Sequence, residues 1–147
     1  MKPFGARPRP GANRMIHKPM KPIKKNYLSY DVTVRTSSDG EIALTEIWEQ
    51  DGQVSRANGP AVIERSDLTG QVILEAWCMN GTEHRKCGPA ITEYHDSEDG
   101  TIALQAWKWE GKHHRRGGPA VQEWSDTGNL LREEWWLNGR KLGDRRT

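Results

Sequence analysis

The sequence predicts an all-β protein of tandem antiparallel β-hairpin repeats, about four units with a period of ~29 residues. The units are expected to form a twisted meander or a short solenoid behind an extended N-terminal arm. Gly-Pro-Ala occurs three times, starting at Gly59, Gly88 and Gly118, at spacings of 29 and 30 residues. A tryptophan and a glycine-containing turn recur at fixed places around each copy. A fixed period in this range is typical of stacked supersecondary units.

The repeat domain is expected to span 26–143 and to open with a hairpin. Tyr30, Val32 and Val34 alternate with polar residues across 26–36, which is the pattern of a half-buried strand. The turn at 37–40 ends in Asp-Gly, a strong hairpin signal, and a second strand is predicted over 41–48.

The later units superpose into columns. Each tryptophan follows a Glu or Gln by two residues, and a glycine comes four residues after it. Four residues beyond that glycine stands an arginine, and Gly-Pro-Ala begins three residues later. We predict that the tryptophans stack as the core, because each ring buries on the order of 150–250 Å². This core column consists of Trp48, Trp77, Trp107 and Trp135.

The arginine and glutamate columns have two interpretations. The arginines are Arg56, Arg85 and Arg115, and the glutamates are Glu46, Glu75 and Glu133. The arginines are either offered to an anionic ligand or paired with glutamates of the same or the neighbouring unit. We favour the structural ladder of pairs, because the arginine recurs while other positions vary and its guanidinium suits bidentate pairing. The last unit has Gly143 in place of the arginine, as expected of a capping repeat.

The repeat pattern resembles MORN-type β-hairpin repeats, in the long-period variety seen in bacterial, phage and large-virus proteins. The matching residues are 70–81, His84-Arg85 and Gly88-Pro89-Ala90. The resemblance covers roughly 37–139 and implies hairpins strung in a row. It brings no catalytic residues. Some proteins with such repeats are labelled antitoxins, and others connect proteins or membranes.

The first 25 residues form a basic, proline-rich arm that we expect to be disordered in isolation. They hold five of the eight prolines and no Asp or Glu. Their basic residues are Lys2, Arg7, Arg9, Arg14, Lys18, Lys21, Lys24 and Lys25. The arm is expected to bind a partner, either by threading along an acidic protein groove or by contacting nucleic-acid phosphates. We favour the protein, because Phe4 is the arm's one aromatic residue and the remaining chain is acidic. A short basic tail is predicted at 144–147.

Few residues suggest reactive chemistry. Cys78, His84 and Cys87 are close enough in sequence to raise zinc binding, but the repeat itself accounts for the histidine. A disulfide between Cys78 and Cys87 stays open. Signatures of a nucleophile elbow, a phosphate loop or paired carboxylates are absent from the sequence. We therefore expect no enzymatic activity, no metal and no cofactor.

Trp136 is the aromatic residue that the repeat explains least. Its neighbour Trp135 belongs to the core column, so Trp136 is predicted to point to the other face of the strand. Exposed aromatic residues often anchor interfaces. We therefore assign Trp136, together with the basic residues of the arm, to partner binding.

The sequence favours a non-enzymatic structural or interaction protein. Its repeat sheet and arm would bind neighbouring protein subunits, or further copies of itself, in a larger assembly such as a phage or viral particle. An antitoxin-like inhibitor of a partner enzyme, implied by the resemblance, and nucleic-acid binding through the arm are the alternatives. Without an apolar run of about 20 residues or an apolar leader, we expect cytoplasmic synthesis, no membrane span and incorporation into a virion as the setting.

Overall fold

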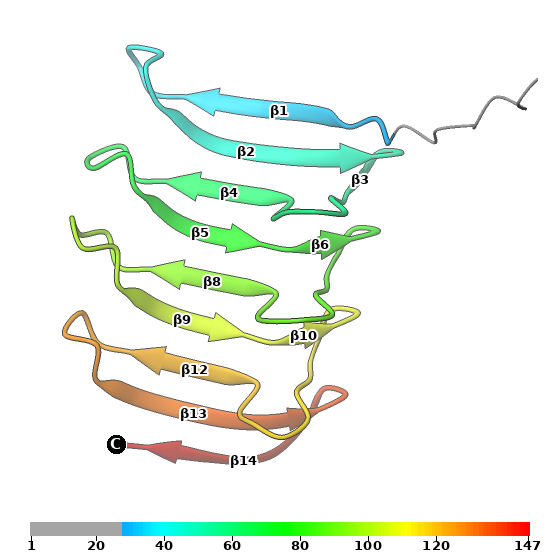
Figure 1. The fold of residues 1–147 in the computed structure, drawn as a ribbon, viewed down its shortest axis with the longest axis vertical. Helices are drawn as coiled ribbons and strands as arrows, with labels where there is room; N and C mark the ends of the chain where they lie inside the picture. Colours follow the sequence, from blue (N-terminus) through cyan, green and yellow to red (C-terminus); the bar gives the residue numbers. More distant parts are fainter. Residues whose placement is uncertain (1–27) are drawn as a thin grey trace, which may run out of the picture.

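The computed structural model describes residues 28–147, which form strands joined by turns and loops (Figure 1). Ten strands make one antiparallel meander in the order β1-β2-β4-β5-β8-β9-β12-β13-β14, with β3 paired to β2. The long strands are β1 Asp31–Thr36, β2 Ala43–Gln50, β4 Val62–Arg65, β5 Val72–Ala76, β8 Ile91–Tyr94, β9 Ile102–Ala106, β12 Val121–Trp124, β13 Leu130–Leu137 and β14 Arg140–Arg146. The short strands are β3 Gln53–Val54, β6 Cys78–Met79, β7 Thr82–Glu83, β10 Lys108–Trp109 and β11 Lys112–His113.

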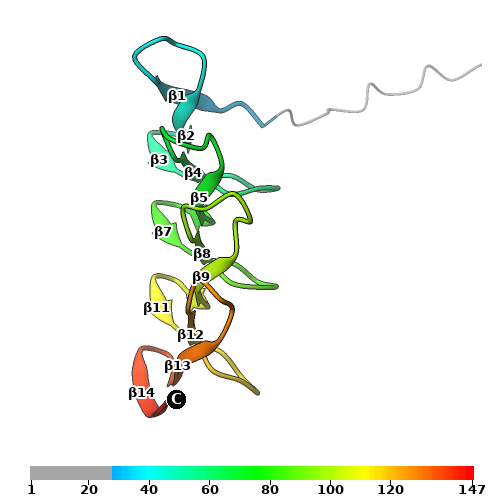
Figure 2. The ribbon, with the colours of Figure 1, turned by 90° about the vertical axis from the view of Figure 1, so that its left-hand side faces the viewer.

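The sheet is an open single layer. The first strand, β1, pairs with β2, and the last strand, β14, pairs with β13, so the two ends of the meander do not close on each other. Figure 2 shows this layer edge-on, with β3, β7 and β11 in a column on one side. The loops that lead from them to β4, β8 and β12 project to the other side. Of the two predicted forms, the chain therefore adopts the meander and not the short solenoid. Among the described residues, no helix exists that would be long and apolar enough to cross a membrane.

Short hairpins interrupt the long strands once in each unit. β6 pairs with β7, and β10 pairs with β11, across two-residue turns. The first turn residue has a φ of 49–53° and the following glycine a φ of 72–79°. Two successive positive φ angles give the turn whose twist matches the strands that flank it. These turn residues are Asp51-Gly52, Asn80-Gly81, Glu110-Gly111 and Asn138-Gly139.

The alanine of Gly-Pro-Ala joins two strands at once. The amide of Ala90 donates to the carbonyl of Ala106 at 2.8 Å, and its carbonyl accepts from the amide of Trp77 at 2.7 Å. Ala61 and Ala120 make the equivalent pairs of bonds. All three alanines have 0% of their surface exposed, so a larger side chain has no room there.

The most buried positions of the sheet are small. Alanines and a few other side chains are buried, and no large side chain in the described part of the chain is fully buried. The tryptophans predicted as the core are half-buried, and Trp48 packs against the cluster of Ala61, Ala76 and Cys78. The fold is thus held by a thin strip in each unit, as expected of stacked repeats.

Both ends of the repeat domain differ in detail from the prediction. The first two strands were predicted over 26–36 and 41–48, and they occupy Asp31–Thr36 and Ala43–Gln50. Residues 144–146, predicted to lie in a basic tail, belong to β14. That strand pairs with β13 from Arg132 to Leu137, with a register irregularity between Trp135 and Trp136 that leaves Leu142 without a partner in the ladder. The arm over 1–25 lies outside the described residues.

Candidate functional site

Each arginine of the repeat lies flat over the tryptophan of its own unit. The guanidinium carbon is 3.7 Å from the ring centre in the Arg56–Trp48 pair and 3.9 Å in the Arg85–Trp77 pair. The Arg115 guanidinium lies 3.7 Å from the ring centre of Trp107. Such cation–π contacts contribute about 0.5–2 kcal/mol, depending on how far the pair is desolvated.

The same guanidinium also binds the Gly-Pro-Ala loop. Nη1 donates to the carbonyl of the proline four residues later, at 3.2 Å in Arg56, 3.1 Å in Arg85 and 2.9 Å in Arg115. The residue before that proline has to be glycine, because the guanidinium occupies the space that a side chain would take. A Cβ placed on Gly59 or Gly118 would come within 3.0–3.1 Å of the guanidinium carbon. The Arg-x-x-Gly-Pro spacing therefore encodes one loop closed by its own arginine.

This geometry corrects the predicted arginine–glutamate pairing. Within residues 28–147 no ion pair joins the arginine column to the glutamate column, because ring and carbonyl occupy the guanidinium. Glu46 pairs instead with Arg65 at 2.6 Å, and Glu133 pairs with Arg145 at 2.5 Å. Glu75 accepts a hydrogen bond from the hydroxyl of Tyr94 at 3.3 Å.

The histidines of the repeat connect one short hairpin to the next. The Nδ1 atom of His84 accepts from the amide of Glu110 at 3.2 Å, and that of His114 accepts from Asn138 at the same distance. In the first unit the hydroxyl of Ser55 takes this place and accepts from Asn80 at 3.4 Å. An acceptor at Nδ1 leaves the proton of a neutral imidazole on Nε2. These histidines fix the spacing of the hairpins.

The cysteines are free thiols in different surroundings. Cys78 is buried and Cys87 is exposed, so the disulfide that the sequence left open is not formed. Burial, aided by Glu83 and opposed by Lys108, raises the pKa of the Cys78 thiol above its ordinary value. In the described part of the chain, no three His, Cys, Asp or Glu side chains are grouped so as to hold a metal ion.

Trp136 is half-buried within its own layer. Its Nε1 donates to a carboxylate oxygen of Glu134 at 2.9 Å, and its ring centre lies 5.4 Å from that of His113. Trp136 therefore contacts Glu134 and His113, and its place on the face opposite Trp135 stays a prediction. The basic arm residues assigned with it to partner binding lie outside the described residues.

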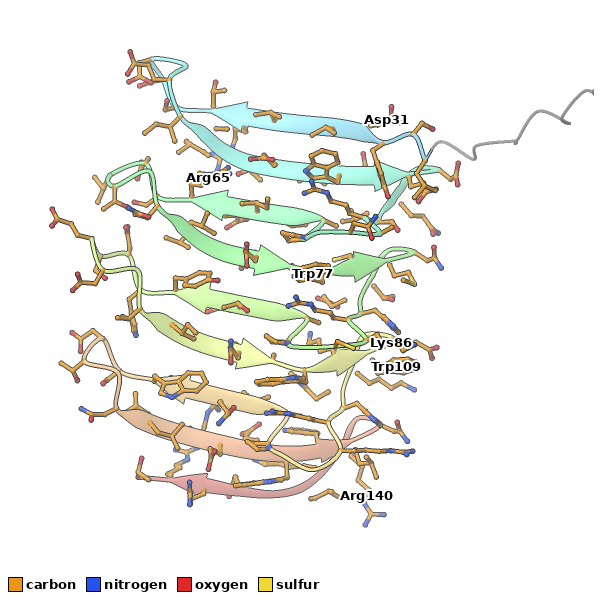
Figure 3. All side chains as sticks on the ribbon, in the orientation of Figure 1. Asp31, Arg65, Trp77, Lys86, Trp109 and Arg140 are labelled. Atoms are coloured by element: carbon orange, nitrogen blue, oxygen red, sulfur yellow. The ribbon has the colours of Figure 1, made fainter. Side chains whose placement is uncertain are left out.

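Hollows lie along the side of the sheet where the strands end in the short hairpins. This side, the basic edge, runs across the strand ends and is distinct from the end strands β1 and β14. One has a volume of about 330 Å³ and is lined by residues of two successive units, among them Lys86, Trp109 and Arg116. A second, of about 360 Å³, lies beside it and shares Trp109 and Arg116. Figure 3 shows Lys86 and Trp109 together at this edge, with Arg140 farther along it.

The sequence interpretation did not single out Lys86, Trp109 or Arg116. The two cations have a signal in the sequence, which is a basic doublet. Arg85-Lys86 and Arg115-Arg116 stand where the first unit has Arg56 followed by alanine. The repeat needs one arginine, so the second basic residue is additional.

Comparison with known proteins adds no relative. No family model matches the chain, and neither a curated protein nor a solved structure proved similar to it.

Proposed function

We propose that this chain is a non-enzymatic interaction protein that joins neighbouring protein subunits in a larger assembly, through the β1 edge of its sheet and its basic arm. The observation that carries the proposal is the difference between the two end strands. The β1 strand at one end favours pairing with a further strand, whereas the charged β14 strand at the other end disfavours it.

The β1 edge is open to pairing. All six residues of β1 are exposed, and Val32 and Val34 keep 42% and 50% of their surface accessible. Asp31 and Arg35 are the charged residues of this strand, so its centre is uncharged. An exposed edge of this kind is a template for an added strand, whose backbone supplies the affinity.

The β14 edge is protected by charge. Five of its seven residues are charged, and Lys141 forms ion pairs with Asp144 at 2.7 Å and Glu134 at 3.0 Å. Charged side chains on an edge strand discourage pairing with another chain. A partner strand is therefore directed to β1.

The arm immediately precedes this edge in the sequence. Eight basic residues joined to the chain close to β1 favour a neighbour with an acidic surface beside its pairing strand. The resemblance of the repeats to those of phage and large-virus proteins favours a particle as the setting.

The test is co-sedimentation of the full-length chain with particles purified from its native source. Val32→Lys/Val34→Lys should abolish incorporation while leaving the fold intact, since both side chains are exposed. Leu142→Lys, at a site on β14 that is 57% exposed, is the control for an added charge on an end strand and should incorporate normally. Deletion of 1–25 should weaken incorporation more at low salt than at high salt, because high salt already screens the charges of the arm in the intact chain.

Normal incorporation of the double valine variant would contradict the proposal. So would equal losses in the valine variant and the Leu142→Lys control.

A further inference from the structure

In the two middle units the charges separate to opposite edges of the sheet, whereas the hairpin and loop segment of the first unit holds Glu49 and Asp51 against Arg56. The turns at 66–70, 95–100 and 125–129 contain acidic residues and no Lys or Arg. The hairpin and loop segments at 78–90 and 108–120 carry six Lys and Arg residues against Glu83 and Glu110. Figure 1 shows that the turns between β4 and β5, β8 and β9, and β12 and β13 lie on one side of the sheet and the short hairpins on the other. The alternation of charge along the sequence therefore places acidic residues on the first side and basic residues on the second.

The hollows of the basic edge are free of carboxylates. Four of them are lined by arginine, lysine, histidine and tryptophan together with small and apolar residues and Asn138, and no Asp or Glu is among the described residues that line them. A carboxylate oxygen of Glu83 lies 3.6 Å from Nζ of Lys108, so this acidic residue is paired within the protein. Lys86 and Arg116 are exposed and form no ion pair within residues 28–147. Their charge is available to a ligand.

Trp109 stands between two of these hollows. It keeps 41% of its surface exposed, and both adjoining hollows include its ring together with His114 and Arg116. The imidazole of His84 lies 4.2 Å from the indole, measured between ring centres, and supports it from within the protein. Since His84 is itself held by the amide of Glu110, the indole is a fixed platform.

We propose that this edge binds single-stranded nucleic acid, with a base stacked on Trp109 and phosphates held by Lys86 and Arg116. Proteins that bind single strands combine a basic groove with aromatic rings on which bases stack. An acidic peptide would use the cations but has no need of the indole. Duplex nucleic acid keeps its bases paired and away from such a ring. The site involves neither the arm nor the β1 edge, so it stands apart from the proposed protein interaction.

The experiment measures fluorescence anisotropy of labelled oligouridine and oligothymidine of about 15 nucleotides, a length that suits single-strand sites of this type. The full-length chain is compared with Lys86→Glu/Arg116→Glu. The matched control, Arg35→Glu/Arg146→Glu, makes the same change in net charge at two exposed residues of the end strands. We expect the affinity of the edge variant to fall at least tenfold and that of the control less than threefold. Trp109→Leu should weaken binding by about fivefold or more, as the loss of one stacked base predicts.

A second measurement locates the site. Cys87 is exposed and lines a hollow of the same edge with Arg85 and Lys86, whereas Cys78 is buried. A dye placed on Cys87 should respond to the oligonucleotide.

Three outcomes would overturn the proposal. Equal affinity of all variants would assign binding to the arm, which none of them alters. Equal losses in both charge variants would show a long-range charge effect only. Polyglutamate that competes as well as the oligonucleotide, together with unchanged binding by Trp109→Leu, would point to an acidic protein.

Discussion

At the scale of single residues, the repeat is defined by how one arginine is used. Arg115 covers Trp107 and donates to Pro119, and Gly118 leaves room for it. The column of glutamates has the same period, so periodicity alone cannot distinguish a salt bridge from a cation–π contact. The glycine three positions after the arginine distinguishes the two contacts, because it leaves room for a guanidinium over the tryptophan ring.

Gly118→Ala should lower the free energy of unfolding by about 1 kcal/mol, because its Cβ would push the guanidinium off Trp107. In an Arg115→Ala background this cost should disappear, which a double-mutant cycle in urea would measure. Gly117→Ala is the control for backbone strain: its φ is +79°, but no atom lies near its Cβ. Its cost should persist in the Arg115→Ala background. An undiminished cost of Gly118→Ala in that background would contradict the assigned contact.

His113 should make stability depend on pH. Burial, aided by Lys108 and opposed by Glu134 and Glu83, holds the pKa of His113 below its ordinary value. The folded state then binds a proton less readily than the unfolded state does. Stability is therefore full above about pH 6.5 and declines as the pH falls from there through the lower pKa of the folded state. A titration of the histidine ring carbons by NMR should show the lowered pKa, and His113→Gln should flatten this part of the stability profile. Titration of His113 at or above the ordinary value would contradict this expectation.

At the scale of elements, β14 shows how the last unit ends the sheet. The earlier units leave the long strand for a short hairpin and a Gly-Pro-Ala loop, whereas the last unit returns along β13 to Arg146. Arg145 reaches Glu133, which is buried and also bonded to the side-chain amide of Gln122 at 3.0 Å. The strand thus completes a polar network that lies inside the layer.

Removal of 144–147 should therefore destabilise the protein by about 2 kcal/mol, because it breaks the bonds of Arg145 and Asp144 as well as backbone pairing. Chemical denaturation followed by circular dichroism would measure the change. Arg140→Ala, which changes an exposed residue of the same strand, is expected to cost less than about 0.5 kcal/mol. A neutral effect of the truncation would indicate that these residues behave as the tail predicted from sequence.

At the scale of the whole molecule, the sheet is a linear array in which each unit contacts the units beside it. Buried alanines recur in the middle strands and loops from Ala61 to Ala120, whereas every residue of β1 and β14 is exposed. Stability in such arrays is a sum of unit and interface contributions, and opening starts at the ends.

Hydrogen exchange should follow this order. The amides of Trp77, Ala90 and Trp107, each bonded across the middle strands, should exchange most slowly. Those of β1 and β14 should exchange much faster by mass spectrometry or NMR. The same protection in all strands would instead indicate that the array unfolds in a single step.

Much of this fold can be predicted from the sequence because its signals are local. The Asp-Gly and Asn-Gly turns, the recurring Trp107-type position and the alternation around Val32 predict antiparallel hairpins in a row. The short hairpins were missed as separate elements because each of their strands has only two residues, too few to show an alternating pattern. The basic edge was missed because charges were summed along the chain. The net charge does not reveal that acidic and basic residues are separated in space, because this separation arises only when alternate turns lie on opposite sides of the folded sheet.

The bridging alanines make the length of the sheet adjustable in steps. Ala61, Ala90 and Ala120 join their strands by the same two backbone bonds, so one unit can follow another at any of these joints. A unit of 29 or 30 residues adds two strands, or about 9.5 Å of height. Duplication or excision of one unit would move β1 and β14 apart or together by that step and leave both ends chemically unchanged. The number of units thus sets the distance between the two end strands of the sheet.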